Sequence, residues 1–119
     1  MQILLASASP RRAELLATAG YVFAVKPCTV DETPLPGEIP ALYVARLAAA
    51  KADAVTDVAT NNVILGADTC VVLDGDILGK PIDDADAARM LGRLSGRSHE
   101  VLTGVSMRYA NQRVGAVDR

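Results

Sequence analysis

Residues 7–12, Ser-Ala-Ser-Pro-Arg-Arg, place hydroxyls and two cations where an apolar run gives way to a helical pattern. Ser9 is a favourable N-cap, and Pro10 suits the first helical position. The N–H groups and dipole of a helix N-terminus attract anions and disfavour cations such as Arg11 and Arg12. A bound polyanion explains both arginines; the alternative is that they lie on a solvated helix face.

Two more charged residues interrupt apolar patterns. Asp68 divides the apolar stretch 63–73, and aspartate is depleted in strands. We expect either a half-buried carboxylate suited to base or metal chemistry or an aspartate that bonds a turn or bulge. Lys51 falls on the apolar face of a predicted helix, where its ammonium either extends to solvent or points into a cleft.

Glu32 and Lys80 lie in predicted loops. Glu32 belongs to paired acids, which are usually solvated but can hold a divalent cation. Lys80 stands in Gly-Lys-Pro, where glycine permits close approach of a ligand; the alternative is an ordinary turn lysine. These carboxylates and lysines, with the arginine pair, suit a triphosphate and a metal ion, although no Walker or dinucleotide glycine motif is present.

The elements that must position these residues alternate between strand and helix. Asp74-Gly75 is a typical hairpin turn, and Asp83 or Asp84 caps the last helix. This order predicts an α/β fold with a mixed sheet. The expected helices are 10–19, 40–58 and a third ending at Gly96, and the expected strands are 2–6, 22–26, 63–67, 70–73, 77–78, 101–109 and 113–117.

Composition excludes several function classes. A chain of 119 residues is one domain by length, and its net charge of −2 argues against a nucleic-acid wrapper or a basic membrane-surface protein. Cys28, Cys70 and His99 show no zinc spacing, so we expect reduced, buried thiols. No apolar run is long enough to span a membrane and no signal-peptide pattern is present, so we expect a cytoplasmic location.

Six motifs, in order, resemble the Maf family over essentially the whole chain. They are Ser-Ala-Ser-Pro-Arg-Arg (7–12), Val-Asp-Glu (30–32), Ala-Ala-Lys-Ala (49–52), Gly-Ala-Asp-Thr (66–69), Gly-Lys-Pro (79–81) and Leu-Ser-Gly-Arg-Ser-His-Glu-Val-Leu-Thr-Gly (94–104). The resemblance implies a cytoplasmic pyrophosphatase that cleaves nucleoside triphosphates to monophosphate and diphosphate with Mg²⁺ or Mn²⁺. It also implies a twisted mixed sheet flanked by helices, with a deep nucleotide cleft, related to inosine triphosphate pyrophosphatases.

The same resemblance assigns roles to the candidate residues. Asp68 matches the proton acceptor, and with Glu32 it is the expected metal ligand. Gly-Ala-Asp-Thr resembles the branch that acts on dTTP and UTP, whereas the 7-methyl-GTP branch tends to carry Gly-Ser-Asp-Gln. The residues expected to bind substrate or set its specificity are Ser7, Ser9, Arg11, Arg12, Lys51, Thr69 and Lys80.

The expected reaction is metal-assisted hydrolysis at the α-phosphorus, with Asp68 taking the proton from the attacking water. The alternative is a nucleotide-binding or protein-binding regulator of the septum-inhibitor type with little or no turnover. A third alternative, a purely structural domain, would not explain why these charged residues occur together.

The resemblance also suggests a shortened chain. Family members usually continue after the strand at 101–109 with another strand, a helix and a segment that closes the cleft. We therefore expect an uncovered sheet edge and apolar surface, and a homodimer or larger assembly that covers them. We also expect weakened turnover and reduced discrimination between bases.

Overall fold

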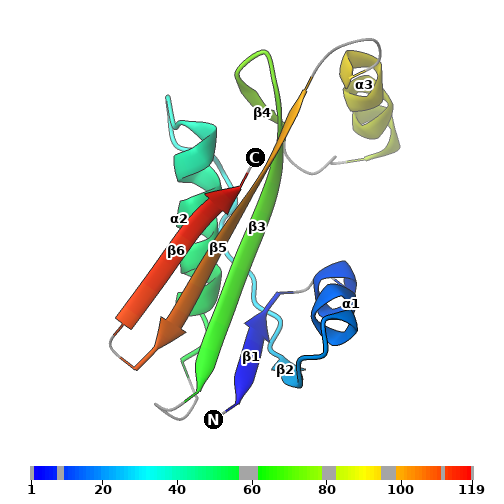
Figure 1. The fold of residues 1–119 in the computed structure, drawn as a ribbon. Helices are drawn as coiled ribbons and strands as arrows, with labels where there is room; N and C mark the ends of the chain where they lie inside the picture. Colours follow the sequence, from blue (N-terminus) through cyan, green and yellow to red (C-terminus); the bar gives the residue numbers. More distant parts are fainter. Residues whose placement is uncertain are drawn as a thin grey trace.

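The computed structural model describes residues 2–7, 10–56, 62–78, 83–94, 99–110 and 112–118. The elements run β1 (Ile3–Ala6), α1 (Pro10–Thr18), β2 (Phe23–Val25), α2 (Pro40–Asp53), β3 (Val63–Leu73), β4 (Asp76–Leu78), α3 (Asp84–Leu94), β5 (Glu100–Tyr109) and β6 (Gln112–Asp118) (Figure 1). The predicted end of the last helix at Gly96 lies outside the described residues.

The strands form one mixed sheet in the order β2-β1-β3-β5-β6, with β4 paired to β3. The pairs β1–β2 and β1–β3 are parallel, whereas β3–β4, β3–β5 and β5–β6 are antiparallel. Asp74 and Gly75 both have positive φ in the turn between β3 and β4, which is the backbone shape that a two-residue hairpin needs. The predicted α/β class and this hairpin are confirmed.

Strand β3 runs without a break through Asp68, so the expected division into two strands was wrong. The Asp68 side chain is only 7% exposed, and its charge is compensated by Lys51 of α2. A buried carboxylate with such a partner is compatible with a strand, and the depletion of aspartate from strands was therefore overridden by a tertiary contact.

Helix α2 ends at Asp53, earlier than the predicted 58. Arg108 of β5 donates hydrogen bonds to the carbonyl groups of Ala52 and Val55, at the end of this helix. The last carbonyl groups of a helix have no partner within the helix, and a cation beside them also interacts favourably with the helix dipole. The sheet thus supplies the C-terminal cap.

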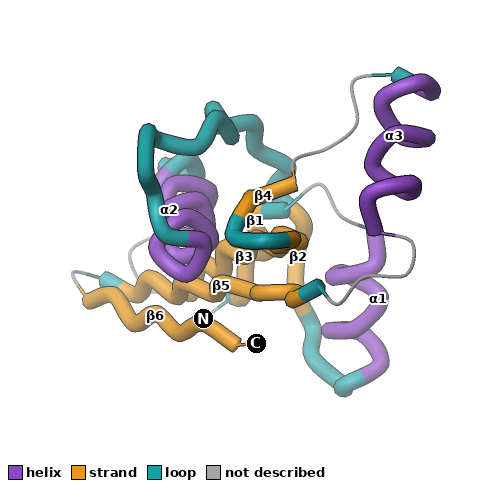
Figure 2. The backbone as a smooth tube through the Cα atoms, turned by 90° about the horizontal axis from the view of Figure 1, so that it is seen from above, coloured by secondary structure: helices purple, strands orange, loops and turns teal. Residues whose placement is uncertain are grey.

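Helix α2 rests directly on β3 and β5, on one face of the sheet (Figure 2). It does so because glycine stands beneath it in both strands. A Cβ atom on Gly66 would lie 2.2 Å from the Ala48 carbonyl oxygen, and one on Gly104 would lie 2.5 Å from that of Val44. The helix face that meets the sheet is buried; it comprises Tyr43, Val44, Leu47, Ala48 and Ala52.

Helix α1 lies on the other face of the sheet (Figure 2) and buries none of its own residues completely. Beyond it, β5 and β6 expose large apolar side chains: Val101, Val105, Met107, Tyr109 and Val114. The expected uncovered apolar sheet surface is therefore present among the described residues. The assembly that would cover it stays a prediction.

The two cysteines are free thiols. Cys70 is buried, as expected, whereas Cys28 is only half-buried, so the expectation for Cys28 was wrong. Burial raises the pKa of both thiols, which keeps them protonated. Within the part of the chain that the structure describes, no helix is long and apolar enough to cross a membrane.

Candidate active site at the end of strand β1

The candidate site lies where β1 stops and β3 continues. Ala6 pairs with Gly66, and β4 begins to pair only at Val71. In the described ranges, no strand flanks residues 67–70 of β3 on this side. Successive side chains of a strand point to opposite faces. Asp68 therefore faces α2 and Thr69 faces α1, so the site has two sides.

On the α2 side, Lys51 joins two carboxylates that are far apart in the sequence. Its Nζ atom lies 2.9 Å from Asp68 Oδ1 and 3.4 Å from Glu32 Oε1. The Lys51 side chain is 13% exposed, so its ammonium points inward and does not extend to solvent. The structure thus places Glu32, Lys51 and Asp68 in one cluster with more negative than positive charge.

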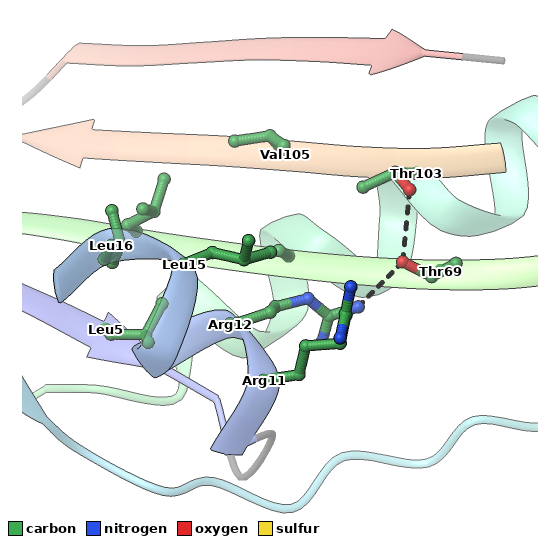
Figure 3. Close-up of a pocket in the computed structure, with 10 residues that line it drawn as sticks. Leu5, Arg11, Arg12, Leu15, Leu16, Thr69, Thr103 and Val105 are labelled. Carbon is green, nitrogen blue, oxygen red and sulfur yellow. Dashed lines mark hydrogen bonds between the residues drawn. The ribbon is translucent and has the colours of Figure 1, made fainter. Parts of the chain in front are cut away.

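On the α1 side, Arg12 reaches across to the sheet. Its Nη2 donates to Thr69 Oγ1 over 2.9 Å, and its Nη1 donates to Ser7 Oγ over 3.4 Å. Thr69 Oγ1 lies in turn 3.2 Å from Thr103 Oγ1 (Figure 3). Arg12 is therefore held against the sheet and does not lie on a solvated face.

A pocket of about 510 Å³ opens between α1 and the sheet beside these groups. This volume falls in the range of small-molecule sites. Arg11, Arg12, Thr69 and Thr103 form its polar part (Figure 3). The remaining walls are apolar and come from Leu5, Leu15, Leu16, Leu65, Ala67 and Val105.

The two acids of the loop before α2 have different surroundings. Asp31 accepts a hydrogen bond from the Thr33 backbone N–H, which lowers the pKa of Asp31 and closes a turn. Glu32 forms the ion pair with Lys51. Of the paired acids, only Glu32 thus joins the cluster around Asp68.

Comparison with known proteins identifies the family. The family model described as "Maf-like protein" matches residues 2–118. The chain belongs to this family. Two curated relatives named dTTP/UTP pyrophosphatase come from Citrifermentans bemidjiense and Geobacter sulfurreducens. They are 55% identical over 97% of this chain and 53% identical over 96% of it. The Maf-like chain spans about 59% of the length of each.

The fold also has a solved counterpart. The Staphylococcus aureus Ham1 protein superposes with a TM-score of 0.60 at 16% identity, over 98% of this chain and 68% of that one. The predicted Maf resemblance and the predicted mixed sheet flanked by helices are both confirmed.

The described part of the Maf-like site includes Thr103, which the sequence did not single out. Thr103 lies within the motif at 94–104, but only its register opposite Thr69 brings the two hydroxyl groups together. The periodicity of the two strands indicates the face of each side chain, but not which residues of β3 and β5 stand opposite each other. Two predicted site residues, Ser9 and Lys80, lie outside the described residues.

The donor set of the Maf-like site fits a cation that arrives with phosphate groups. Glu32 and Asp68 supply carboxylate oxygens, the ligands that Mg²⁺ and Mn²⁺ prefer. Among the described residues, no group of three or more His, Cys, Asp or Glu side chains could hold a metal ion. Two carboxylates with substrate phosphates and waters are the usual surroundings of catalytic Mg²⁺.

Glu38 makes the stability of this chain depend on pH. Hydrogen bonds from Arg46 and from the Leu35 backbone lower the pKa of Glu38 from 4.5 to about 2. A depressed carboxyl pKa contributes stability above the ordinary pKa, and that contribution is lost as the pH falls from about 4.5 through about 2. We expect Glu38→Gln to be less stable at neutral pH and to lose less stability across this window.

Urea unfolding midpoints at a series of pH values test this expectation for the wild type and Glu38→Gln. Asp84→Asn, at an exposed position on α3, is the matched control for the removal of one carboxylate. Parallel slopes for Glu38→Gln and the wild type would show that the contact with Arg46 contributes nothing.

Proposed function

We propose that this chain carries the catalytic site of a nucleoside triphosphate pyrophosphatase that converts dTTP and UTP to monophosphate and diphosphate. The observation that carries the proposal is the ion pair of Lys51 with the buried Asp68, next to the contact of Arg12 with Thr69. The relatives named dTTP/UTP pyrophosphatase support the same substrates.

In this proposal some of the charged groups bind the substrate, and others act on the attacking water. Lys51 binds phosphate oxygens and stabilises the charge that develops in the transition state, whereas Arg12, on the other side of β3, faces the base pocket. Asp68 orients the attacking water and accepts its proton, so that the oxygen attacks the α-phosphorus. The second carboxylate, Glu32, lies 3.4 Å from Lys51 and keeps the ammonium directed at the cluster.

A divalent cation, Mg²⁺ or Mn²⁺, belongs to the proposed site. Maf-family pyrophosphatases generally depend on a metal, and Glu32 and Asp68 would hold it together with the phosphates. When bound, the ion neutralises phosphate charge and acidifies water. This proposal also assigns Ser9 and Lys80 to the binding of the phosphates, because both belong to the family motifs.

The pocket beside α1 receives the base in this proposal. Its apolar walls suit the faces of a ring, and its polar end offers the Arg12 guanidinium and the hydroxyl groups of Thr69 and Thr103. Thymine and uracil present two carbonyl acceptors and one N–H donor. A guanidinium donates to carbonyls, and a hydroxyl group can either donate or accept.

A nucleotide panel tests the proposed reaction. With Mg²⁺ or Mn²⁺, we expect dTTP and UTP to yield nucleoside monophosphate and diphosphate, faster than dCTP, dATP and dGTP. Chromatography of the products and a diphosphate assay measure this. Asp68→Asn, purified in the same way, controls for contaminating phosphatases. Release of orthophosphate and nucleoside diphosphate would refute attack at the α-phosphorus, and binding without any release would favour the regulator.

A further inference from the structure

The segment that carries Glu32 has no helix or strand of its own. It joins β2 to α2, and Glu32 lies in its middle. The ion pair of Glu32 with Lys51 therefore depends on contacts that hold this loop against the helix. Without such contacts a long loop samples many conformations, and a carboxylate on it has no defined distance from its partner.

Two side chains of α2 hold the loop at consecutive backbone carbonyls. Tyr43 Oη donates to the carbonyl oxygen of Glu32 over 2.6 Å. Arg46 Nη2 donates to the carbonyl oxygen of Thr33 over 3.2 Å. Tyr43 and Arg46 are three positions apart in α2 and so lie on one face of the helix. Together they anchor the two peptide units that follow the Cα atom of Glu32.

Tyr43 is the more rigid of the two anchors. Its side chain is buried with Val44, Leu47 and Leu102 in the core between α2 and the sheet. Its hydroxyl group donates to the Glu32 carbonyl, and close packing of the core restricts movement of the ring.

Arg46 is held in place by its own partners. Its Nε and Nη2 atoms donate to the two carboxylate oxygens of Glu38, over 2.7 and 2.9 Å. Its guanidinium also lies 5.7 Å from the centre of the Tyr43 ring. Bidentate pairs of this kind fix a guanidinium in both position and orientation. Glu38, Arg46 and Tyr43 thus form one connected support for the loop.

We propose that Tyr43 is a positioning residue. By holding the Glu32 carbonyl group, it fixes the position from which the Glu32 carboxylate contacts the Lys51 ammonium. This inference rests on the proposed function, because its kinetic consequence needs the Glu32, Lys51 and Asp68 cluster to be catalytic. Tyr43 itself contacts the Glu32 backbone and acts on the reaction only through the Glu32 carboxylate.

Tyr43→Phe is the test, because it removes one oxygen and keeps the buried ring. Tyr21→Phe is the matched control, since Tyr21 is 56% exposed and stands just after α1, outside the segment 29–38. Hydrogen–deuterium exchange of the segment 29–38 should be faster in Tyr43→Phe and unchanged in Tyr21→Phe. This readout needs no nucleotide, so it judges the anchoring role even if the proposed function is wrong.

A double-mutant cycle of Tyr43→Phe with Glu32→Gln tests the kinetic role. We expect Tyr43→Phe to lower kcat roughly tenfold, the loss that one hydrogen bond of ordinary strength predicts, with KM nearly unchanged. The double variant should be no slower than Glu32→Gln alone, because both changes act through the same carboxylate. Arg46→Lys, which keeps the charge and loses the bidentate contact, should show a smaller loss of the same kind.

The outcomes separate the two claims. A wild-type chain that hydrolyses no nucleotide refutes the proposed function, and the exchange experiment still decides whether Tyr43 anchors the loop. An active wild type with unchanged exchange in Tyr43→Phe, or with losses that add in the cycle, overturns the positioning role. A purely structural residue would lower the amount of folded protein and leave kcat per folded molecule unchanged.

Discussion

Asp68→Asn is expected to lower kcat by a factor on the order of 10²–10⁴ while nucleotide affinity stays close to that of the wild type. Asparagine has the shape of aspartate, and its Oδ1 atom can still accept the hydrogen bond that Lys51 donates over 2.9 Å. The amide cannot accept the proton of the attacking water. The loss should therefore fall on kcat and leave KM nearly unchanged.

Steady-state diphosphate release and equilibrium binding of a non-hydrolysable triphosphate measure the two quantities separately. Asp84→Asn is the matched control, because Asp84 is exposed in the first turn of α3. A kcat for Asp68→Asn within a few-fold of the wild type would remove Asp68 from the role of base. A large loss of affinity with unchanged kcat would make it a binding residue.

Gly66→Ala is expected to destabilise the fold by about 3 kcal/mol, near the upper end of the usual overpacking penalty. The added methyl group would lie 2.2 Å from the Ala48 carbonyl oxygen and 2.8 Å from the Ala52 backbone nitrogen. Both are backbone atoms of α2, so no flexible side chain can move aside. The helix must shift as a body, which also draws Lys51 away from Asp68 and lowers activity.

The matched control is Gly92→Ala, a glycine within helix α3 whose added Cβ meets no atom within 4 Å. It should stabilise the chain by about 0.5–1 kcal/mol, because alanine is the better helix former. Urea unfolding gives both free-energy changes. If Gly66→Ala unfolds at the wild-type urea concentration, then α2 can shift on the sheet without cost, and the proposed close packing is wrong.

Features that depend on neighbouring residues were determined by the sequence itself. Pro10 at the start of α1, the turn at Asp74 and Gly75, and the apolar periodicity of α2 all act over a few positions. They specify the helices, the hairpin and the α/β class. The charged residues Lys51 and Asp68 were also recognisable, since each interrupts an apolar pattern and belongs to a family motif.

Which of these residues meet was decided only by the tertiary structure. Lys51 reaches Asp68 because Gly66 and Gly104 let α2 approach the sheet closely, and this contact allows β3 to continue through a carboxylate. Neither the role of these glycines nor the continuity of β3 follows from local propensity. Both depend on the packing of elements that are distant in the chain.

The two-sided arrangement of the site has the same origin. Asp68 and Thr69 are neighbours in sequence, yet the pleat of β3 sends one to α2 and the other to α1. Thr103 joins Thr69 through the register of β3 and β5, and Tyr43 holds Glu32 through the packing of a loop on a helix. Register and packing are set by contacts between distant segments, so a single sequence carries no local signal for them.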